Sequence, residues 1–220
     1  ELSLPEAALL EMPGGMSPAL VIERFDIRRG PTDHRRLAME DFCSILDLPA
    51  SAKYDGTIER MARGLRPLST DPARDLDILF RRAVFAWLIA DGDMHLKNLA
   101  LLKVAEVDAK AFRSVRFAPL YDAVTTRVFP GLGGDRMALK LNGKDARLTR
   151  QDFLALARTI GLSAEGAETA IGELTARLAQ GAQTIALPEI AIEVEAARTT
   201  KDKAMGSILE RCRALAAEGD

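Results

Sequence analysis

The chain has 220 residues, of which 48% are hydrophobic and only 5% aromatic, a composition typical of a globular protein that buries one good core or two small ones. Thirty basic residues against 32 acidic ones leave a formal net charge of −2, so no overall positive field indicates a nucleic acid or an anionic membrane as a partner. The sequence contains neither an apolar run long enough to span a bilayer nor a charged and then apolar leader. We therefore expect a soluble, cytoplasmic protein without a membrane partner.

The N-terminal quarter of the chain predicts a β-hairpin followed by a helix. AALLEM (7–12) and PALVIERF (18–25) are apolar and are joined by PGGMS, a turn signal. RRGPTD (28–33) is a polar break in the pattern. LAMEDFCSILDL (37–48) then repeats apolar residues at spacings of three and four and ends before Pro49, which predicts a helix.

The clearest helix start lies near the middle of the chain. A short helix is predicted over 57–65, and after it Asp71 is an N-cap candidate followed by Pro72 at the first helical position. Apolar residues recur from there at helical spacing up to Ala90. Because they cover more than half of the helix circumference, we expect this helix to be central in the fold.

The rest of the chain predicts short strands or extended segments and then helices. The strand candidates are 99–104, 115–120 and 137–144, and the helix candidates are 149–162, 163–182 and 187–216. Thr149 with Asp152 and Ser163 with Gly166 are candidate N-terminal caps of the first two helices. The only cysteines, Cys43 and Cys212, have apolar neighbours at helical spacing and are interpreted as buried free thiols. The predicted fold is α+β and mainly helical, with a small β insertion around 95–142.

The stretch ADGDMHLKNLALL (90–102) concentrates polar chemistry where this insertion leaves the central helix. Asp93 and Asn98 are spaced as D-x-x-x-x-N, and Asp122 follows 24 residues after Asn98. Phosphoryl transfer by protein kinases uses such a set: an Asp for the attacking hydroxyl, and an Asn and a second Asp for magnesium. Lys97 could neutralise a phosphate oxygen. The spacing alone is weak, however, and favours a polar helix end and turn.

Other kinds of site fit this stretch less well. Asp91, Asp93 and His95 imitate the first ligands of a calcium loop, but Leu96 replaces its turn glycine and Leu102 its bidentate acid. A zinc site is disfavoured because His34 and His95 are the only histidines and the two cysteines lie far away in the sequence. GLGG (131–134) leads into no helix, so we interpret it as a flexible turn near the mouth of the site and not as a phosphate loop.

Five motifs in order resemble the HipA-like serine/threonine kinases, the toxins of bacterial toxin–antitoxin pairs. DGDMHLKN resembles the D-x-H-x-K-N signature of that family. The other four segments that resemble it are ALVIERFD (19–26), MEDFCSILDLPASAKY (39–54), FAPLYD (117–122) and MALKLNGK (137–144). Five motifs in register are far more specific than any one of them.

The resemblance implies a role for each matching residue. Asp93 would be the catalytic base, and Asn98 and Asp122 would bind magnesium. The hinge would take the adenine of ATP through backbone groups, and His95 and Lys97 would lie against its phosphates. The residues assigned to the nucleotide in this way are Glu23, Arg24, Phe25, His95, Lys97, Asn98, Tyr121 and Asp122. A strand that ends at Phe25 and then breaks also suits a hinge.

The resemblance also implies a domain organisation and partners. Residues 1–26 would form a hinge hairpin and residues 27–220 the helical catalytic C-terminal lobe. An N-terminal lobe with a phosphate-covering loop and a strand lysine is not in this sequence, and truncation is favoured because the chain does not begin with Met. The implied function is an ATP- and magnesium-dependent kinase toxin, restrained by a helix-turn-helix antitoxin that binds operator DNA. The implied substrate is an aminoacyl-tRNA synthetase, namely glutamyl-tRNA synthetase in the best-known members. The alternative is a module that binds the antitoxin without catalysis.

Overall fold

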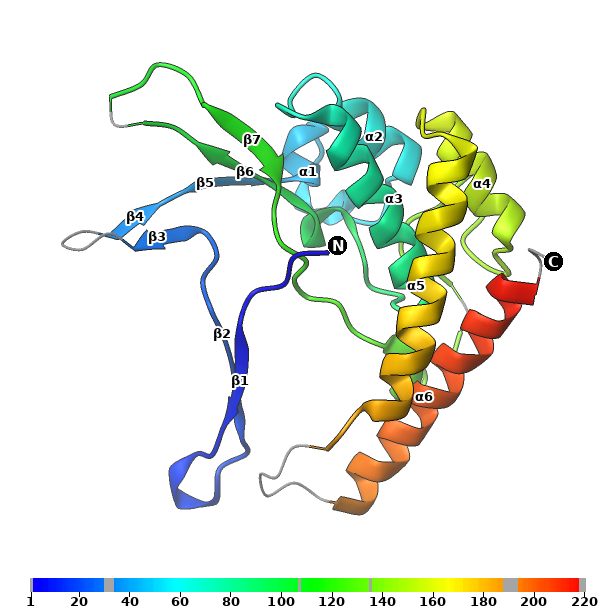
Figure 1. The fold of residues 1–220 in the computed structure, drawn as a ribbon. Coiled ribbons are helices and arrows are strands. Elements are labelled where there is room, and N and C mark those ends of the chain that lie inside the picture. The colour runs from blue at the N-terminus through cyan, green and yellow to red at the C-terminus, as the bar shows by residue number, and fades with distance from the viewer. Residues whose placement is uncertain (1, 30–33, 107, 135, 188–193, 218–220) are drawn as a thin grey trace.

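A helical body carries small antiparallel sheets along one side in the computed structural model, which describes residues 2–29, 34–106, 108–134, 136–187 and 194–217 (Figure 1). The helices are α1 (Phe42–Ile45), α2 (Ile58–Leu65), α3 (Pro72–Leu88), α4 (Arg150–Thr159), α5 (Ala164–Thr184) and α6 (Val194–Ala217). The strands are β1 (Ala7–Leu10), β2 (Ala19–Ile22), β3 (Ile27–Arg29), β4 (His34–Arg36), β5 (Ala38–Asp41), β6 (Ala100–Val104) and β7 (Ser114–Phe117). The expected mainly helical α+β class is confirmed.

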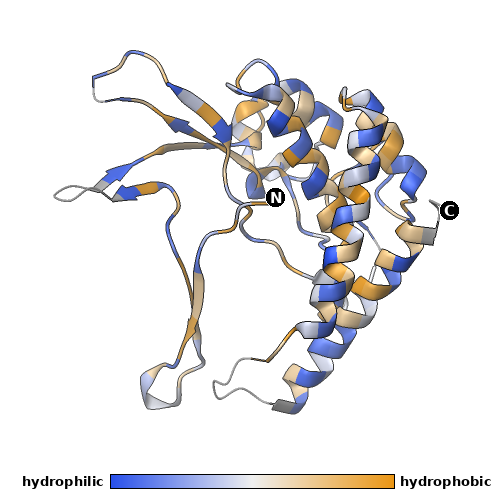
Figure 2. Ribbon diagram, viewed as in Figure 1, coloured by the Kyte–Doolittle hydropathy of each residue, from blue (hydrophilic) through white to orange (hydrophobic). Residues whose placement is uncertain are grey.

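The predicted N-terminal hairpin is present, but its second strand ends at Ile22 and not at Phe25. Strands β1 and β2 pair antiparallel, with Ala7 opposite Ile22 and Leu10 opposite Ala19. The hairpin stands away from the helical body (Figure 1). Leu10, Leu20 and Val21 remain exposed on it, and Figure 2 shows apolar residues along both of its strands.

Two predictions of secondary structure are wrong. The helix expected over 37–48 is a strand, β5, followed by the single helical turn α1. The side chain of Asp41 ends the strand by accepting a hydrogen bond from the Ser44 N–H at 3.0 Å, so α1 begins only at Phe42. Because β5 pairs with β6 and β6 with β7, the three-stranded sheet contains a strand from before the helices and is not an insertion confined to 95–142.

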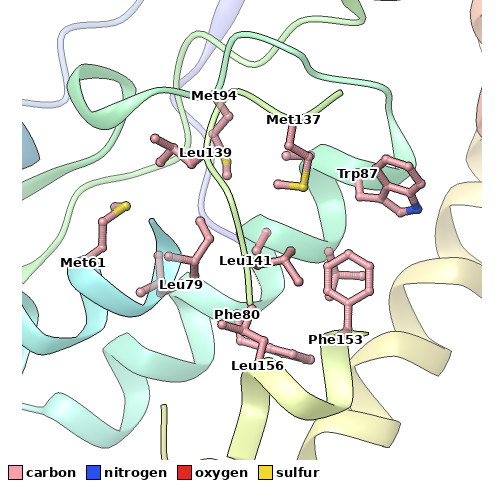
Figure 3. Close-up of a cluster of buried hydrophobic side chains, with 14 of the residues drawn as sticks. Met61, Leu79, Phe80, Trp87, Met94, Met137, Leu139, Leu141, Phe153 and Leu156 are labelled. Carbon is pink, nitrogen blue, oxygen red and sulfur yellow. The ribbon is translucent and has the colours of Figure 1, made fainter. Parts of the chain in front are cut away.

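The second error concerns 137–144, expected as a short strand or an extended segment, where the structure has no continuous strand. This segment makes only isolated bridges, between Thr57 and Lys140 and across the turn from Leu141 to Lys144. Its alternating apolar residues are nevertheless buried, and they point into the core that Figure 3 shows. The strands expected over 99–104 and 115–120 are present as β6 and β7, with β7 shifted toward the N-terminus.

Helix α3 is the centre of the hydrophobic core, as predicted. The Asp71 side chain accepts a hydrogen bond from the Arg74 N–H, and Pro72 takes the first helical position. Helix α3 packs against α2, α4, α5 and α6. The large buried side chains around it include Met61, Leu79, Phe80, Trp87, Phe153 and Leu156 (Figure 3).

The C-terminal helices begin at the predicted caps. Thr149 and Asp152 form a reciprocal capping box on α4, and the Ser163 hydroxyl accepts a hydrogen bond from the Gly166 N–H on α5. Helix α6 confirms the last predicted helix from Val194 onward, whereas residues 188–193 of that prediction lie outside the described residues. Both cysteines are buried free thiols, as expected. Among the helices described, none is long and apolar enough to cross a membrane.

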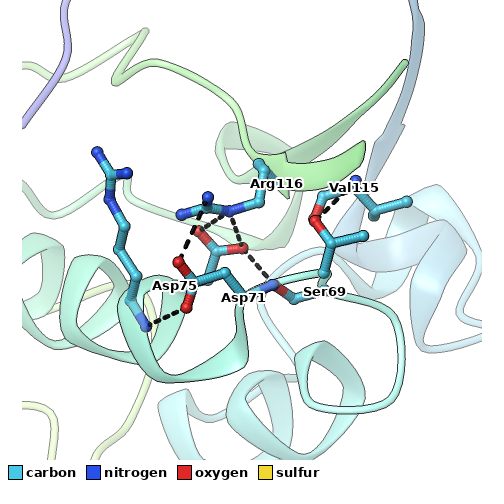
Figure 4. A network of polar contacts seen from close by, with 7 residues as sticks. Ser69, Asp71, Asp75, Val115 and Arg116 are labelled. Carbon is cyan, nitrogen blue, oxygen red and sulfur yellow. Dashed lines mark hydrogen bonds and ion pairs between the residues drawn. The ribbon is translucent and has the colours of Figure 1, made fainter. Parts of the chain in front are cut away.

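A buried polar network joins the start of α3 to β7 (Figure 4). The carboxylate of Asp75 is completely buried. It accepts hydrogen bonds from Arg116 Nε, at 3.1 Å to each oxygen, and from Ser69 Oγ at 2.5 Å. Arg116 also lies 3.6 Å from a carboxylate oxygen of Asp71. The network fixes the strand that leads to the FAPLYD segment against the central helix.

Candidate functional site

The loop after α3 brings Asp93 and Asn98 together. Ala90, with a φ of 59°, turns the chain away from the helix axis. The carbonyl oxygen of Asp93 then accepts hydrogen bonds from the His95 N–H at 2.7 Å and from Asn98 Nδ2 at 3.0 Å. Because the Asn98 amide nitrogen is used inside the loop, its Oδ1 atom is the one that can meet a ligand.

The carboxylate of Asp93 is held by a tyrosine that we did not predict as a site residue. The Tyr54 hydroxyl donates a hydrogen bond to Asp93 Oδ1 at 2.5 Å. This bond favours the neutral phenol and is the main reason that the pKa of Tyr54 is raised to about 12. With one oxygen held, the second oxygen of Asp93 is the one left to accept a further hydrogen bond. Tyr54 closes the MEDFCSILDLPASAKY motif, which carried the family resemblance without indicating this role.

Asp91 ties this loop to the segment that carries Asp122. Its buried carboxylate accepts the Asp93 N–H at 2.9 Å and is also hydrogen-bonded by the backbone of Val124. Burial, with a smaller contribution from the negative charges of Asp93 and Asp122, raises the pKa of Asp91 to about 6. Asp122, on that segment, takes a left-handed φ of 55°.

The raised pKa of Asp91 gives a testable effect on stability. Its folded pKa lies above the ordinary value of 3.8, so the ionised form is disfavoured in the fold. The stabilisation from binding a proton is present below 3.8 and is lost as the pH rises through about 6. Asp91→Asn keeps an acceptor for the two backbone groups. We expect it to raise the free energy of unfolding at pH 7 by about 2 to 3 kcal/mol.

Urea unfolding of the parent and of Asp91→Asn at pH 7 and near pH 4 measures this effect. The gain in the free energy of unfolding should disappear near pH 4, because Asp91 is then protonated in the folded parent. Asp55→Asn, at an exposed aspartate, is the control and should change little at either pH. An equal gain at both pH values would show that Asp91 carries no ionisation penalty.

His95 is buried, and its ring meets Tyr54 edge-on at 5.1 Å between ring centroids. Burial and then the positive charge of Lys53 lower the pKa of His95, so the imidazole is neutral at pH 7. Its Nδ1 atom has no hydrogen-bond partner among the described residues. The predicted contact of His95 with the phosphates stays a prediction, and it would be a contact of a neutral ring.

The predicted hinge residues line one cleft with Lys97 and Tyr121. This cleft has a volume of about 810 Å³. Its lining residues are Ile22, Glu23, Arg24, Phe25, Asp26, Arg36, Leu37, Ala38, Met39, Asp41, Lys97 and Tyr121. The rings of Phe25 and Tyr121 lie 5.5 Å apart between centroids. Five of the eight residues assigned to the nucleotide therefore meet here: Glu23, Arg24, Phe25, Lys97 and Tyr121.

Two of the charged side chains at this cleft are already paired. Lys97 Nζ lies 2.5 Å from Asp41 Oδ2, and this ion pair raises the pKa of Lys97. Arg24 donates from Nε and Nη2 to the two oxygens of Asp26, at 2.7 and 2.5 Å, and these bonds hold the pKa of Asp26 at about 2. A phosphate that Lys97 is to neutralise must therefore share it with Asp41.

Asp93 lies in the wall of a second cleft, of about 680 Å³. The lining residues are Tyr54, Gly92, Asp93, Val124, Thr126, Phe129, Gly131, Leu132, Gly134 and Arg136. The GLGG turn borders this cleft, and no helix begins directly after it. The sequence did not predict the apolar walls of this cleft.

Comparison with known proteins decides the family. The family model described as the HipA-like C-terminal domain matches residues 1–182. This chain belongs to that family. The predicted resemblance to this family is thereby confirmed.

Relatives and solved structures agree with the family assignment. Two Sinorhizobium fredii proteins, named "Putative kinase Y4mE" and "Putative kinase Y4dM", are 32% and 33% identical over 61% and 66% of this chain. A Shewanella oneidensis structure of a HipA toxin with HipB and operator DNA has a TM-score of 0.81, with 18% identity, over 98% of this chain and 52% of that one. The Helicobacter pylori proinflammatory kinase CtkA has a TM-score of 0.52, with 16% identity, over 96% of this chain and 79% of that one.

The matched region is only part of these relatives. It spans 31% and 33% of the two curated proteins. The division of the chain into a hinge hairpin at 1–26 and a catalytic lobe at 27–220 stays a prediction.

Proposed function

We propose that this chain is the catalytic C-terminal lobe of an ATP- and magnesium-dependent serine/threonine protein kinase. One observation carries the proposal. The loop that holds Asp93 and Asn98 also contributes Lys97 to the wall of the cleft that contains the predicted hinge. A single short loop thus joins a nucleotide-sized cleft to the groups that phosphoryl transfer needs for its acceptor and its metal.

The residues present fit a magnesium ion bound together with ATP. Asn98 Oδ1 and the Asp122 carboxylate are hard oxygen donors, which magnesium prefers. In the part of the chain that the structure describes, no three His, Cys, Asp or Glu side chains group as a metal site. The fit is therefore to magnesium that also takes ligands from ATP phosphates and water.

Each residue then has a role in the transfer. Asp93 orients the acceptor hydroxyl and accepts its proton, while Tyr54 keeps the carboxylate in place. Asn98 and Asp122 hold the metal, which when bound supplies charge neutralisation at the phosphates. The Glu23 N–H already donates to the Glu6 carbonyl at 2.8 Å, and the Arg24 carbonyl accepts from the Ile27 N–H at 3.3 Å. We therefore assign the hinge contact with adenine to other backbone groups of Glu23, Arg24 and Phe25.

Asp122→Asn is expected to remove the magnesium dependence of ATP binding, because the amide keeps the shape of the side chain but loses its charge. Calorimetric titration of the chain with ATP, with and without magnesium, measures this. Magnesium should tighten ATP binding to the parent, and we expect the mutant to bind magnesium–ATP about tenfold more weakly. Asp108→Asn is a matched control, because Asp108 is also exposed and also has a left-handed φ, of 61°. An unchanged response to magnesium in Asp122→Asn would exclude Asp122 as a ligand.

The proposed biological setting is a toxin–antitoxin pair in the cytoplasm. The HipA structure that this chain resembles is in complex with HipB and operator DNA. By analogy we propose a helix-turn-helix antitoxin as the partner, with DNA contacted only through it. The family resemblance supports a protein substrate, with an aminoacyl-tRNA synthetase as the candidate.

Transfer of labelled phosphate from ATP to a protein acceptor tests the function. The chain should be assayed alone and mixed with a separately produced N-terminal lobe of a relative, because phosphoryl transfer also needs the covering loop and the lysine of that lobe. We expect transfer after mixing and little from residues 1–220 alone. Antitoxin binding without transfer in either assay would favour the alternative, a non-catalytic binding module.

A further inference from the structure

The second cleft, beside Asp93, has walls that are unusual for a protein surface. Tyr54, Phe129 and Leu132 line it with exposed fractions of 47%, 49% and 55%. Val124 adds a further exposed apolar side chain. These residues come from two distant parts of the sequence, yet the fold places them around one catalytic carboxylate. A cluster of exposed apolar side chains on a protein surface often marks a binding site.

The mainly apolar walls of this cleft do not suit a nucleotide, and the cation among its lining residues, Arg136, is already paired with Asp145 at 3.3 Å. The hinge residues and Lys97 line the other cleft, whereas Asp93 lines this one. Phosphates are strongly hydrated and gain nothing from contact with Phe129 or Leu132. The occupant must bring a hydroxyl to Asp93 and an apolar group to the walls.

We propose that this cleft binds the acceptor polypeptide and selects a large apolar side chain next to the serine or threonine that is phosphorylated. The inference rests on the proposed kinase function and adds a substrate preference to it. A polypeptide supplies a hydroxyl and an apolar side chain at a fixed spacing, which a small polar acceptor such as a sugar does not. The rim is open to a peptide backbone, because the space beside Gly131 and Gly134 is empty within 4 Å of where a Cβ atom would lie.

Peptide binding to the chain tests this inference without any catalysis. Two short peptides, identical except for leucine or glycine beside a central serine, are titrated into isotope-labelled residues 1–220 and followed by NMR. We expect the leucine peptide to shift the backbone amides of Gly92, Gly131 and Leu132. Its affinity should exceed that of the glycine peptide by about tenfold, the usual effect of burying one large apolar side chain.

Two substitutions of equally exposed phenylalanines locate the binding surface. Phe129→Ser should remove the preference for the leucine peptide. Phe112→Ser is the matched control, because Phe112 is 48% exposed but lies on the loop between β6 and β7, and it should leave the preference intact. Both variants change an exposed side chain, and thermal unfolding confirms that they are folded.

Two results would overturn the inference: equal binding of the two peptides, or an unchanged preference in Phe129→Ser. Neither depends on phosphate transfer. A chain that prefers the leucine peptide but transfers no phosphate even when mixed with an N-terminal lobe would refute the kinase proposal and leave the apolar preference of the cleft standing. A chain that transfers phosphate but binds both peptides equally would refute the apolar preference and leave the kinase proposal standing.

Discussion

Asp93→Asn should lower phosphate transfer about a hundredfold to ten-thousandfold, the usual loss when a catalytic base is removed. The amide cannot accept the proton of the acceptor hydroxyl and carries no charge to orient it. Its carbonyl oxygen can still accept the Tyr54 hydrogen bond, and the backbone carbonyl that closes the loop is unchanged. The fold and the nucleotide cleft should therefore be preserved.

The measurement is transfer of radiolabelled phosphate from ATP by the chain mixed with an N-terminal lobe, together with calorimetric titration of ATP. The variant should bind ATP as the parent does and fail in transfer. Asp55→Asn, an exposed aspartate on the turn before α2, should behave as the parent in both assays. Near-parental turnover in Asp93→Asn would exclude this residue as the base.

Asp75→Ala should be among the most destabilising single changes in the chain. It would leave the Arg116 guanidinium and the Ser69 hydroxyl without the buried carboxylate that they share. We expect the free energy of unfolding to fall by about 3 kcal/mol, at the lower end of the range for breaking a buried pair because Arg116 keeps some contact with water.

Asp77 on the same helix provides the control for this experiment. It pairs with Arg81 at 2.8 Å, but its side chain is partly exposed. Asp77→Ala should therefore cost no more than about 1 kcal/mol. Urea unfolding of both variants decides between them, and equal losses would mean that the buried network contributes no more than a surface ion pair.

The parts of the fold that depend on local chemistry could be predicted from the sequence. Asp71 with Pro72, Thr149 with Asp152, and Ser163 mark helix starts because a cap acts within one turn of the chain. The predictions for residues 37–48 and 137–144 were wrong for a different reason. In the first, a strand and a helical turn together imitate helical spacing. In the second, the alternation is real and faces the core, but the fold places no continuous strand beside it to pair with.

The same distinction separates the parts of the site that could and could not be predicted. The D-x-x-x-x-N loop is contiguous, so its residue types and spacing are visible in the sequence. Tyr54 lies 39 positions away from the carboxylate that it holds, and Asp41 meets Lys97 from 56 positions away. No local pattern encodes such contacts, because they depend on how β5, α2 and the loop after α3 come together in space.

The pairing of β5 with β6 also constrains how the protein folds. Helices α1, α2 and α3 lie between these two strands in the sequence. Joining strands so far apart costs chain entropy, so we expect the helices to form first and the sheet to form once they have brought its ends close. Asp41 on β5 and Lys97 just before β6 become neighbours only through that step. We therefore expect ATP binding to appear only at the last stage of folding. A chain whose helices have formed while this sheet is still open would show the circular dichroism of its helices but would bind no ATP.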